Sequence, residues 1–125
     1  MKAVQISDYG GRENLALSDV DVPTPREGEA LVQLDYAGIN FIDVYMRQGD
    51  YRNSSTYGTP LPFTLGMEGA GTIVDPNGAK GISIGNRVAY CLSRGSYAEY
   101  ATVPVWKLVN IPASMDSAVA TVLML

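Results

Sequence analysis

Short runs of alternating apolar and polar residues, each closed by glycine or proline, dominate the first part of this chain. Such runs cover residues 2–7, 15–22 and 29–37, and a two-residue period is typical of strands that bury one face. Two glycines at 10–11 and the proline-bearing segment 23–28 separate the runs with residues that favour turns. The spacing predicts three strands joined as an antiparallel meander.

Three more segments predict further strands in the second part of the chain. Residues 64–75 alternate glycine with apolar residues, and glycine inside a strand commonly marks a bulge or a close backbone approach. We therefore expect a bent barrel strand there. Segments 86–91 and 96–109 are rich in valine and tyrosine, which favour β-structure. A total of about seven short strands with glycine and proline turns indicates a sandwich or a partly open barrel.

Two segments have helical character. Residues 43–49 suffice for about two helical turns, and the polar loop 51–62 has the length of loops that often cover binding sites. Ser114 can cap a second helix over 115–125, which ends on four apolar residues without a C-cap. Such an end should expose an apolar patch unless more chain or a partner covers it. We therefore expect these 125 residues to be cut from a longer protein.

Composition excludes several kinds of partner and site. The length fits one domain, and a net charge of −4 offers no basic surface for nucleic acid or an anionic membrane. The first residues lack the apolar core of a secretory signal, and Cys91 is the single cysteine, so a cytoplasmic protein with a free core thiol is expected. Because the chain has no histidine, it can build neither a Ser-His-Asp triad nor a His-ligated metal site.

Three sequence motifs occur in an order that resembles one family. They are AGINFIDVYMRQGDY at 37–51, LGMEGAG at 65–71 and GNRVAY at 85–90. Together they resemble the zinc-independent, zeta-crystallin-like quinone oxidoreductase branch of the medium-chain dehydrogenase/reductase superfamily, and only its N-terminal domain. The resemblance implies a mainly β (α+β) fold, a GroES-like partly open β-barrel with short helices, over residues 1–125. The family's Rossmann domain, which binds NADPH, would begin shortly after this point.

The resemblance also implies an activity. A member of this branch would pass hydride from NADPH to a quinone without a metal, and the Rossmann domain of the same full-length chain would be the partner of this one. We expect the isolated 125 residues to be inactive, because they contain no Rossmann unit. Two alternatives stay open, an enone or alkenal reductase domain and a stand-alone GroES-like interaction module. A homodimer is possible in the full-length protein.

The resemblance assigns site residues to the first of these motifs. Asn40, Phe41 and Tyr45 would border the nicotinamide of NADPH, while Tyr45 and Tyr51 would hold the carbonyl acceptor. A tyrosine combines an apolar ring with a hydroxyl donor, which suits a flat quinone. The residues themselves also permit simpler interpretations, since asparagine favours turns and a chain with eight tyrosines has many of structural use. We expect Ile42 to be a core residue, and no residue is assigned a catalytic role.

The second motif argues against zinc and against a phosphate-binding loop. Zinc-dependent relatives carry Gly-His-Glu where this chain has Met67, and a thioether is a poor zinc ligand. The cysteines of the catalytic and structural zinc sites are also missing, so no metal is expected. The glycines of 66–71 fall in the order G-x-x-G-x-G, the reverse of a dinucleotide fingerprint, and we interpret them as strand glycines.

Two charged residues near these motifs remain to be placed. Glu68 is predicted to form a buried ion pair with Arg87, with a role as a site acid as the alternative. The sequence Gly-Asn-Arg-Val at 85–88 departs from the family's usual Gly-Asp-Arg-Val by one amide, which leaves the turn intact. The segment 95–100 resembles a structural strand of the family, and no chemistry is assigned to it.

Overall fold

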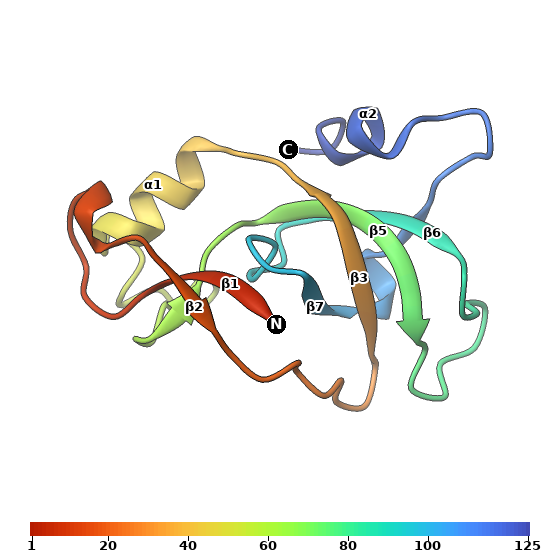
Figure 1. Cartoon of the computed structure of the whole chain (residues 1–125), viewed down its shortest axis with the longest axis horizontal. Helices are drawn as coiled ribbons and strands as arrows, with labels where there is room; N and C mark the ends of the chain where they lie inside the picture. The colour runs from red at the N-terminus through yellow and green to blue at the C-terminus, as the bar shows by residue number, and fades with distance from the viewer.

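The computed structural model describes all residues, Met1–Leu125, and divides them between two antiparallel sheets (Figure 1). The smaller sheet has the order β2-β1-β4. It consists of β1 (Lys2–Ile6), β2 (Ala16–Asp19) and β4 (Phe63–Thr64). β2 lies at its edge and is mostly exposed, whereas β1 buries Ala3 and Ile6.

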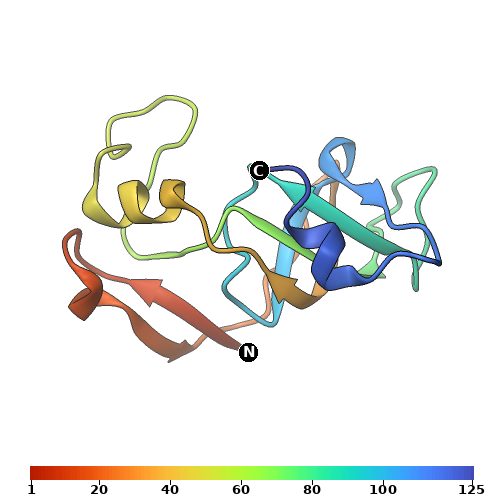
Figure 2. The ribbon, with the colours of Figure 1, turned by 90° about the horizontal axis from the view of Figure 1, so that it is seen from above.

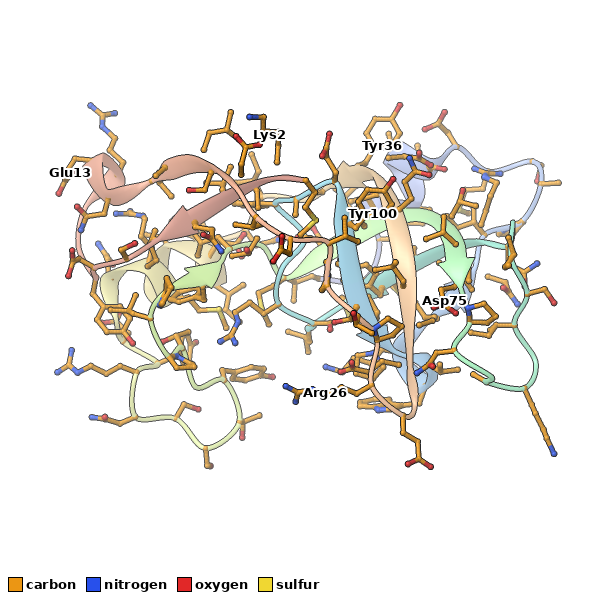
Figure 3. The ribbon with its side chains drawn as sticks, turned by 60° about the horizontal axis from the view of Figure 1, so that its bottom comes forward. Lys2, Glu13, Arg26, Tyr36, Asp75 and Tyr100 are labelled. Atoms are coloured by element: carbon orange, nitrogen blue, oxygen red, sulfur yellow. The ribbon has the colours of Figure 1, made fainter.

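The larger sheet has the order β7-β3-β5-β6-β8. Its strands are β3 (Glu29–Ala37), β5 (Glu68–Asp75), β6 (Arg87–Cys91), β7 (Tyr100–Pro104) and β8 (Val109–Asn110). The β3–β5 pair has two irregularities of register, which bend both strands as bulges do. Tyr36 and Asp75 lie towards opposite ends of this pair (Figure 3).

Two short α-helices and two single 3-10 turns complete the chain. α1 (Phe41–Gln48) lies beside the smaller sheet, and α2 (Ser117–Thr121) lies on the larger one, at the other end of the molecule (Figure 2). The 3-10 turns are η1 (Arg12–Asn14) and η2 (Val105–Lys107). Neither helix is long and apolar enough to cross a membrane.

The segment before β7 joins the two sheets. Ala98 forms an isolated bridge to Ala3 of β1, and the Val4 amide donates to the Tyr97 carbonyl at 2.8 Å. On its other side the Tyr97 amide donates to the Leu65 carbonyl at 2.9 Å. The sheets therefore form a continuous but unclosed wall, and the predicted partly open β-barrel is confirmed.

Three apolar clusters fill the space between these elements. The largest lies within the five-stranded sheet, the second lies between β1, α1 and the segment 63–67, and the third lies under α2. In the third cluster, the paired residues Ala70 and Ala89 present methyl groups to Ala120 of the helix. Small side chains at these positions let the helix approach the sheet closely.

Gly71 shows why the 64–75 segment is glycine-rich. A Cβ atom at this position would lie 1.9 Å from the Gln33 carbonyl oxygen of the neighbouring strand. No side chain fits that approach, so the prediction of a close backbone contact in a bent barrel strand is confirmed. The predicted strand is nonetheless interrupted, because Leu65, Gly66 and Met67 connect β4 in one sheet to β5 in the other.

Three details of the predicted elements are wrong. The first three strands are no meander, because β3 leaves β1 and β2 and pairs with β5 and β7 instead. The predicted strand over 96–109 contains η2 and ends in β8, so the structure has eight strands. The final helix covers only Ser117–Thr121 and is capped by Asp116, whose carboxylate accepts from the Ala118 amide at 2.7 Å.

Candidate functional site

A cleft of about 660 Å³ opens between α1, the loop after it and the ends of β6 and β8. Its walls are largely apolar and rich in sulfur, with Met46 of α1, Met67 before β5 and Met124 after α2. Methionine side chains adapt to varied apolar shapes, so such a lining suits a flat organic molecule better than a sugar or a phosphate. Cys91 also lines the cleft and is half-buried, so the prediction of a core thiol is wrong.

Two cations line the same cleft. The Lys107 ammonium donates to the Leu92 carbonyl and lies 5.2 Å from the centre of the Trp106 ring. The Arg94 guanidinium donates to the Gly58 carbonyl and lies over the Phe63 ring. Loss of hydration there lowers the pKa of Arg94, an effect that the Tyr9 phenol opposes.

Asn40 lies between α1 and β5. It is the N-cap residue of α1, and its backbone amide donates to Asp43 Oδ2 at 2.9 Å. Its side chain points to the neighbouring strand, where Nδ2 donates to Glu68 Oε1 at 2.7 Å. The simpler interpretation of Asn40 as a turn or cap residue agrees with this N-cap position, and its side-chain amide also holds a buried carboxylate.

Glu68 forms no ion pair with Arg87, so that prediction is wrong. Arg87 instead donates to the Met115 carbonyl and the Ser117 hydroxyl, at 2.8 and 2.9 Å, next to α2. Glu68 and Arg87 lie on the same face of the sheet, but the register pairs Arg87 with Thr72, four residues along β5 from Glu68. At about 3.3 Å per residue, this separates the two positions by roughly 13 Å along the strands. Gly38 makes room for Glu68, since a Cβ atom there would lie 2.0 Å from Oε1.

Asp43 and Tyr97 extend the polar cluster behind Asn40. The Tyr97 hydroxyl donates to Asp43 Oδ2 at 2.8 Å, which links α1 to the segment joining the two sheets. Burial raises the pKa of Asp43, while the bonds from Asn40 and Tyr97 oppose that shift. Burial and the two nearby carboxylates raise the pKa of Tyr97, so its hydroxyl stays a donor. One oxygen of Asp43 and one of Glu68 are buried without a partner.

Phe41 and Tyr45 form an exposed aromatic pair on the first turns of α1. Their ring centres are 6.5 Å apart, and Phe41 is 78% exposed while Tyr45 is 44% exposed. Ile42 turns the other way and packs against the cluster that holds Met46, as predicted for a core residue. Two aromatic rings left in solvent beside Asn40 form an apolar face that the fold itself does not cover.

Tyr51 lies apart from that pair. It is half-buried, packs against the cluster around Met46, and contacts Tyr57 edge to face with 5.8 Å between ring centres. Tyr57 lines the cleft, so Tyr51 supports its wall from behind. Of the four residues assigned by resemblance, Asn40, Phe41 and Tyr45 therefore cluster at the start of α1, and Tyr51 belongs to the cleft side.

Several polar residues of this region were not found by sequence reasoning. Asp43 lies inside the 37–51 motif and Tyr97 inside the 95–100 segment, but neither is assigned a role there, and Arg94 and Lys107 lie in no motif. The pairing of Tyr97 with Asp43 spans 54 positions of sequence. Only the course of the chain between the sheets brings these residues together, so no local spacing could have indicated them.

Met67 occupies an apolar environment in keeping with its side chain. It is 2% exposed and packs in the cluster of Ile6, Met46 and Leu65. No group of three or more histidine, cysteine or acidic residues in the chain has the proximity to hold a metal ion. The thioether thus lines the cleft as a packing group.

Residues 26–113 match the model of the alcohol dehydrogenase GroES-like domain. The chain is 34% identical over 120 residues to a quinone oxidoreductase of Lama guanicoe, covering 93% of this chain and 35% of the relative. It is also 35% identical over 118 residues to a synaptic vesicle membrane protein VAT-1 homolog-like of Mus musculus, covering 93% of this chain and 27% of that protein. The chain thus spans about a third of the length of these relatives.

The fold is similar to that of solved quinone oxidoreductases. The structure of the Escherichia coli quinone oxidoreductase complexed with NADPH superposes with a TM-score of 0.87 at 31% identity. The match covers 97% of this chain and 36% of that one. In that enzyme, the part with this architecture is therefore about a third of a longer chain.

Proposed function

Since this chain belongs to the alcohol dehydrogenase GroES-like domain family, we propose that it is the acceptor-binding domain of an NADPH-dependent quinone oxidoreductase. The apolar cleft beside α1 is the observation that carries the proposal. A quinone is flat and largely apolar with polar carbonyl groups, and the methionine-rich walls match such a body. A Rossmann domain of the same full-length protein would complete the site.

The residues at the start of α1 fit the nicotinamide end of NADPH. The exposed ring of Phe41 offers an apolar face, and Asn40 is held beside it by Glu68. NADPH, when bound, supplies the hydride. The glycines of 66–71 form a connection and a strand, without the helix start that a pyrophosphate requires, so the phosphates would be held outside this domain.

The domain's own residues would bind and orient the acceptor. Tyr45 is partly exposed and can donate a hydrogen bond to a carbonyl oxygen, while Tyr51 holds the cleft wall through Tyr57. Donors placed where negative charge develops stabilise the transition state, and positioning supplies much of the remaining rate. We propose a metal-free mechanism, which the apolar packing of Met67 supports. A cytoplasmic location is part of the same proposal.

The test uses the full-length gene product, identified by its intact mass. We expect saturable NADPH oxidation with a quinone acceptor, and slower oxidation with an enone of similar size. Asn40→Ala should lower kcat/KM by about tenfold or more, the effect of losing roughly 1.4 kcal/mol of transition-state stabilisation. Tyr45→Phe should mainly raise KM for the quinone, whereas Tyr51→Phe should change it less, because phenylalanine keeps the ring contact with Tyr57.

Tyr100→Phe serves as the matched control, because Tyr100 lies on β7 away from the cleft. If the protein prefers the enone, its proposed activity becomes enone or alkenal reduction instead of quinone reduction. Absence of NADPH oxidation with both acceptors would overturn the proposed function. The isolated 125-residue chain should not oxidise NADPH, since it holds only one side of the site.

One observation favours a second candidate, an interaction module. Val122, Leu123 and Leu125 are between 44% and 62% exposed after α2, where an apolar patch is expected. If this patch is a contact surface in its own right, the chain self-associates and Leu123→Asp with Leu125→Asp abolishes the association. Sedimentation of both forms at matched concentrations measures this.

A further inference from the structure

The cleft carries positive charge although the chain is acidic. The sequence has 9 lysines and arginines against 13 aspartates and glutamates. Two of the cations, Arg94 and Lys107, line the cleft, and none of the acidic residues does. A cleft of a chain with net charge −4 is thus selectively positive. Such a local charge favours negative ligands over neutral ones of the same shape.

Neither cation is neutralised by the protein. The only ion pair in the structure joins Lys2 and Asp19, far from the cleft. Lys107 and Arg94 each donate to a backbone carbonyl, which has no net charge and uses one of several N–H donors. Both side chains also lie over aromatic rings, which holds them in place. The two groups are therefore positioned, charged and able to donate further hydrogen bonds.

The surroundings of these cations define the rest of the ligand. Met46, Met67 and Leu92 form an apolar wall, and the Trp106 ring is 81% exposed at the same cleft. A small inorganic anion would leave that apolar surface in water, while a neutral ring would leave both cations unused. A flat apolar body that bears one anionic group satisfies both.

We infer that the cleft selects an anionic acceptor, an aromatic or quinoid ring bearing a carboxylate or sulfonate that meets Lys107 and Arg94. This inference rests on the proposed function and names the acceptor class. Arg94 and Lys107 are then specificity-determining residues, with the ring against the methionines. The carbonyl that accepts hydride would lie on the part of the ring away from the anionic group.

The test measures binding to the chain itself, without cofactor or turnover. Trp106 is the only tryptophan, so its indole N–H gives one resonance that reports on the cleft. The probes are anthraquinone-2-sulfonate and the neutral anthraquinone-2-sulfonamide, which have nearly the same shape. We expect the sulfonate to bind at least about tenfold more tightly, which corresponds to about 1.4 kcal/mol.

Substitutions assign the preference to the two cations. Lys107→Met and Arg94→Met should each reduce the sulfonate preference, and Lys107→Arg should retain it. Lys80→Met is the control, because Lys80 is an exposed cation outside the cleft. Backbone amide spectra establish that each variant is folded. If Lys107→Met does not fold, Arg94→Met still tests the inference, because Arg94 is exposed. The comparison of the two probes on the unaltered chain tests it as well.

Three outcomes would overturn the inference. They are equal affinity for the two probes, a preference that survives both Met substitutions, and displacement of the sulfonate by NADPH, which would assign the cations to the cofactor. Failure of the proposed function is a separate result, since it is seen as absent NADPH oxidation by the full-length protein. A sulfonate preference in the isolated chain can be observed whether or not that oxidation occurs.

Discussion

Asn40 links α1 to β5, the first through its backbone and the second through its side chain. Its backbone starts α1 through Asp43, and its side chain anchors Glu68 at the first position of β5. A buried carboxylate is costly unless it is hydrogen-bonded, so the amide of Asn40 stabilises Glu68 as much as Glu68 orients the amide. The position proposed to face the cofactor is thereby held by the core of the larger sheet.

The space for Glu68 depends on Gly38. Gly38→Ala would place a methyl group 2.0 Å from Glu68 Oε1, so we expect a loss of about 1–3 kcal/mol of unfolding free energy. Urea unfolding measures the loss. In a Glu68→Ala background the same change should cost at least about 1 kcal/mol less, because the clash is gone. Equal costs in both backgrounds would show that Gly38 is required for another reason.

The burial of Asp43 predicts a pH dependence of stability. Its pKa is raised above 3.8 in the folded state, so the folded chain holds this proton more tightly than the unfolded one. The stability contributed by neutral Asp43 is present below about pH 3.8 and is lost as the pH rises through the raised pKa. Asp43→Asn keeps an oxygen acceptor and should remove this loss.

Urea midpoints between pH 3.5 and 7 test the point. The stability of the unaltered chain relative to Asp43→Asn should fall with rising pH, and other carboxylates cancel in the difference. Tyr97→Phe removes a bond that lowers the pKa of Asp43, so it should move the fall to higher pH. A difference that stays constant with pH would contradict the prediction.

At the scale of elements, local patterns predicted strands better than helix ends. The two-residue period placed β3 correctly over Glu29–Ala37, because apolar and polar residues alternate in this segment. At the end of the chain, the sequence pattern predicted the wrong start for the helix. Ser114 has a side chain suited to an N-cap, but Asp116 caps the helix, since Ile111 and Ala120 must both pack on the sheet.

The competition between these two caps can be measured. Asp116→Ala removes the bond to the Ala118 amide and should lower the unfolding free energy by about 1 kcal/mol. Ser114→Ala is the matched control and should change it by less than about 0.5 kcal/mol, because Ser114 is exposed. Thermal unfolding of both variants compares them directly. A larger effect of Ser114→Ala would restore the cap predicted from sequence.

At the scale of the whole molecule, the fold class could be predicted, whereas the side-chain pairings could not. The AGINFIDVY motif predicts Asn40, Phe41 and Tyr45 as site residues, and these three lie together at the start of α1. The partner of Asn40 is 28 positions away, and Glu68 was assigned to Arg87 because charge alone favoured that pair. The cations of the cleft are likewise brought there only by the path of the chain.

The two sheets should differ in local stability. β5 is central in the larger sheet and fully buried over 68–71, whereas β2 is an exposed edge strand of the smaller one. We expect amide hydrogens of β5 to exchange only through global unfolding, and those of β1 and β2 to exchange faster through local opening. Native-state exchange followed by NMR measures both. Equal protection of β1 and β5 would show that the sheets open together.

The position of β3 between β5 and β7 has a consequence for synthesis of the protein. Glu29 pairs with Pro104, so one edge of β3 waits for a partner made 75 residues later (104 − 29). At about 5–20 residues per second, that wait lasts roughly 4–15 seconds. During it, the ribosome displays a nine-residue strand with an open edge. The order in which the segments are translated thus leaves β3 without one of its two partner strands while these residues are made.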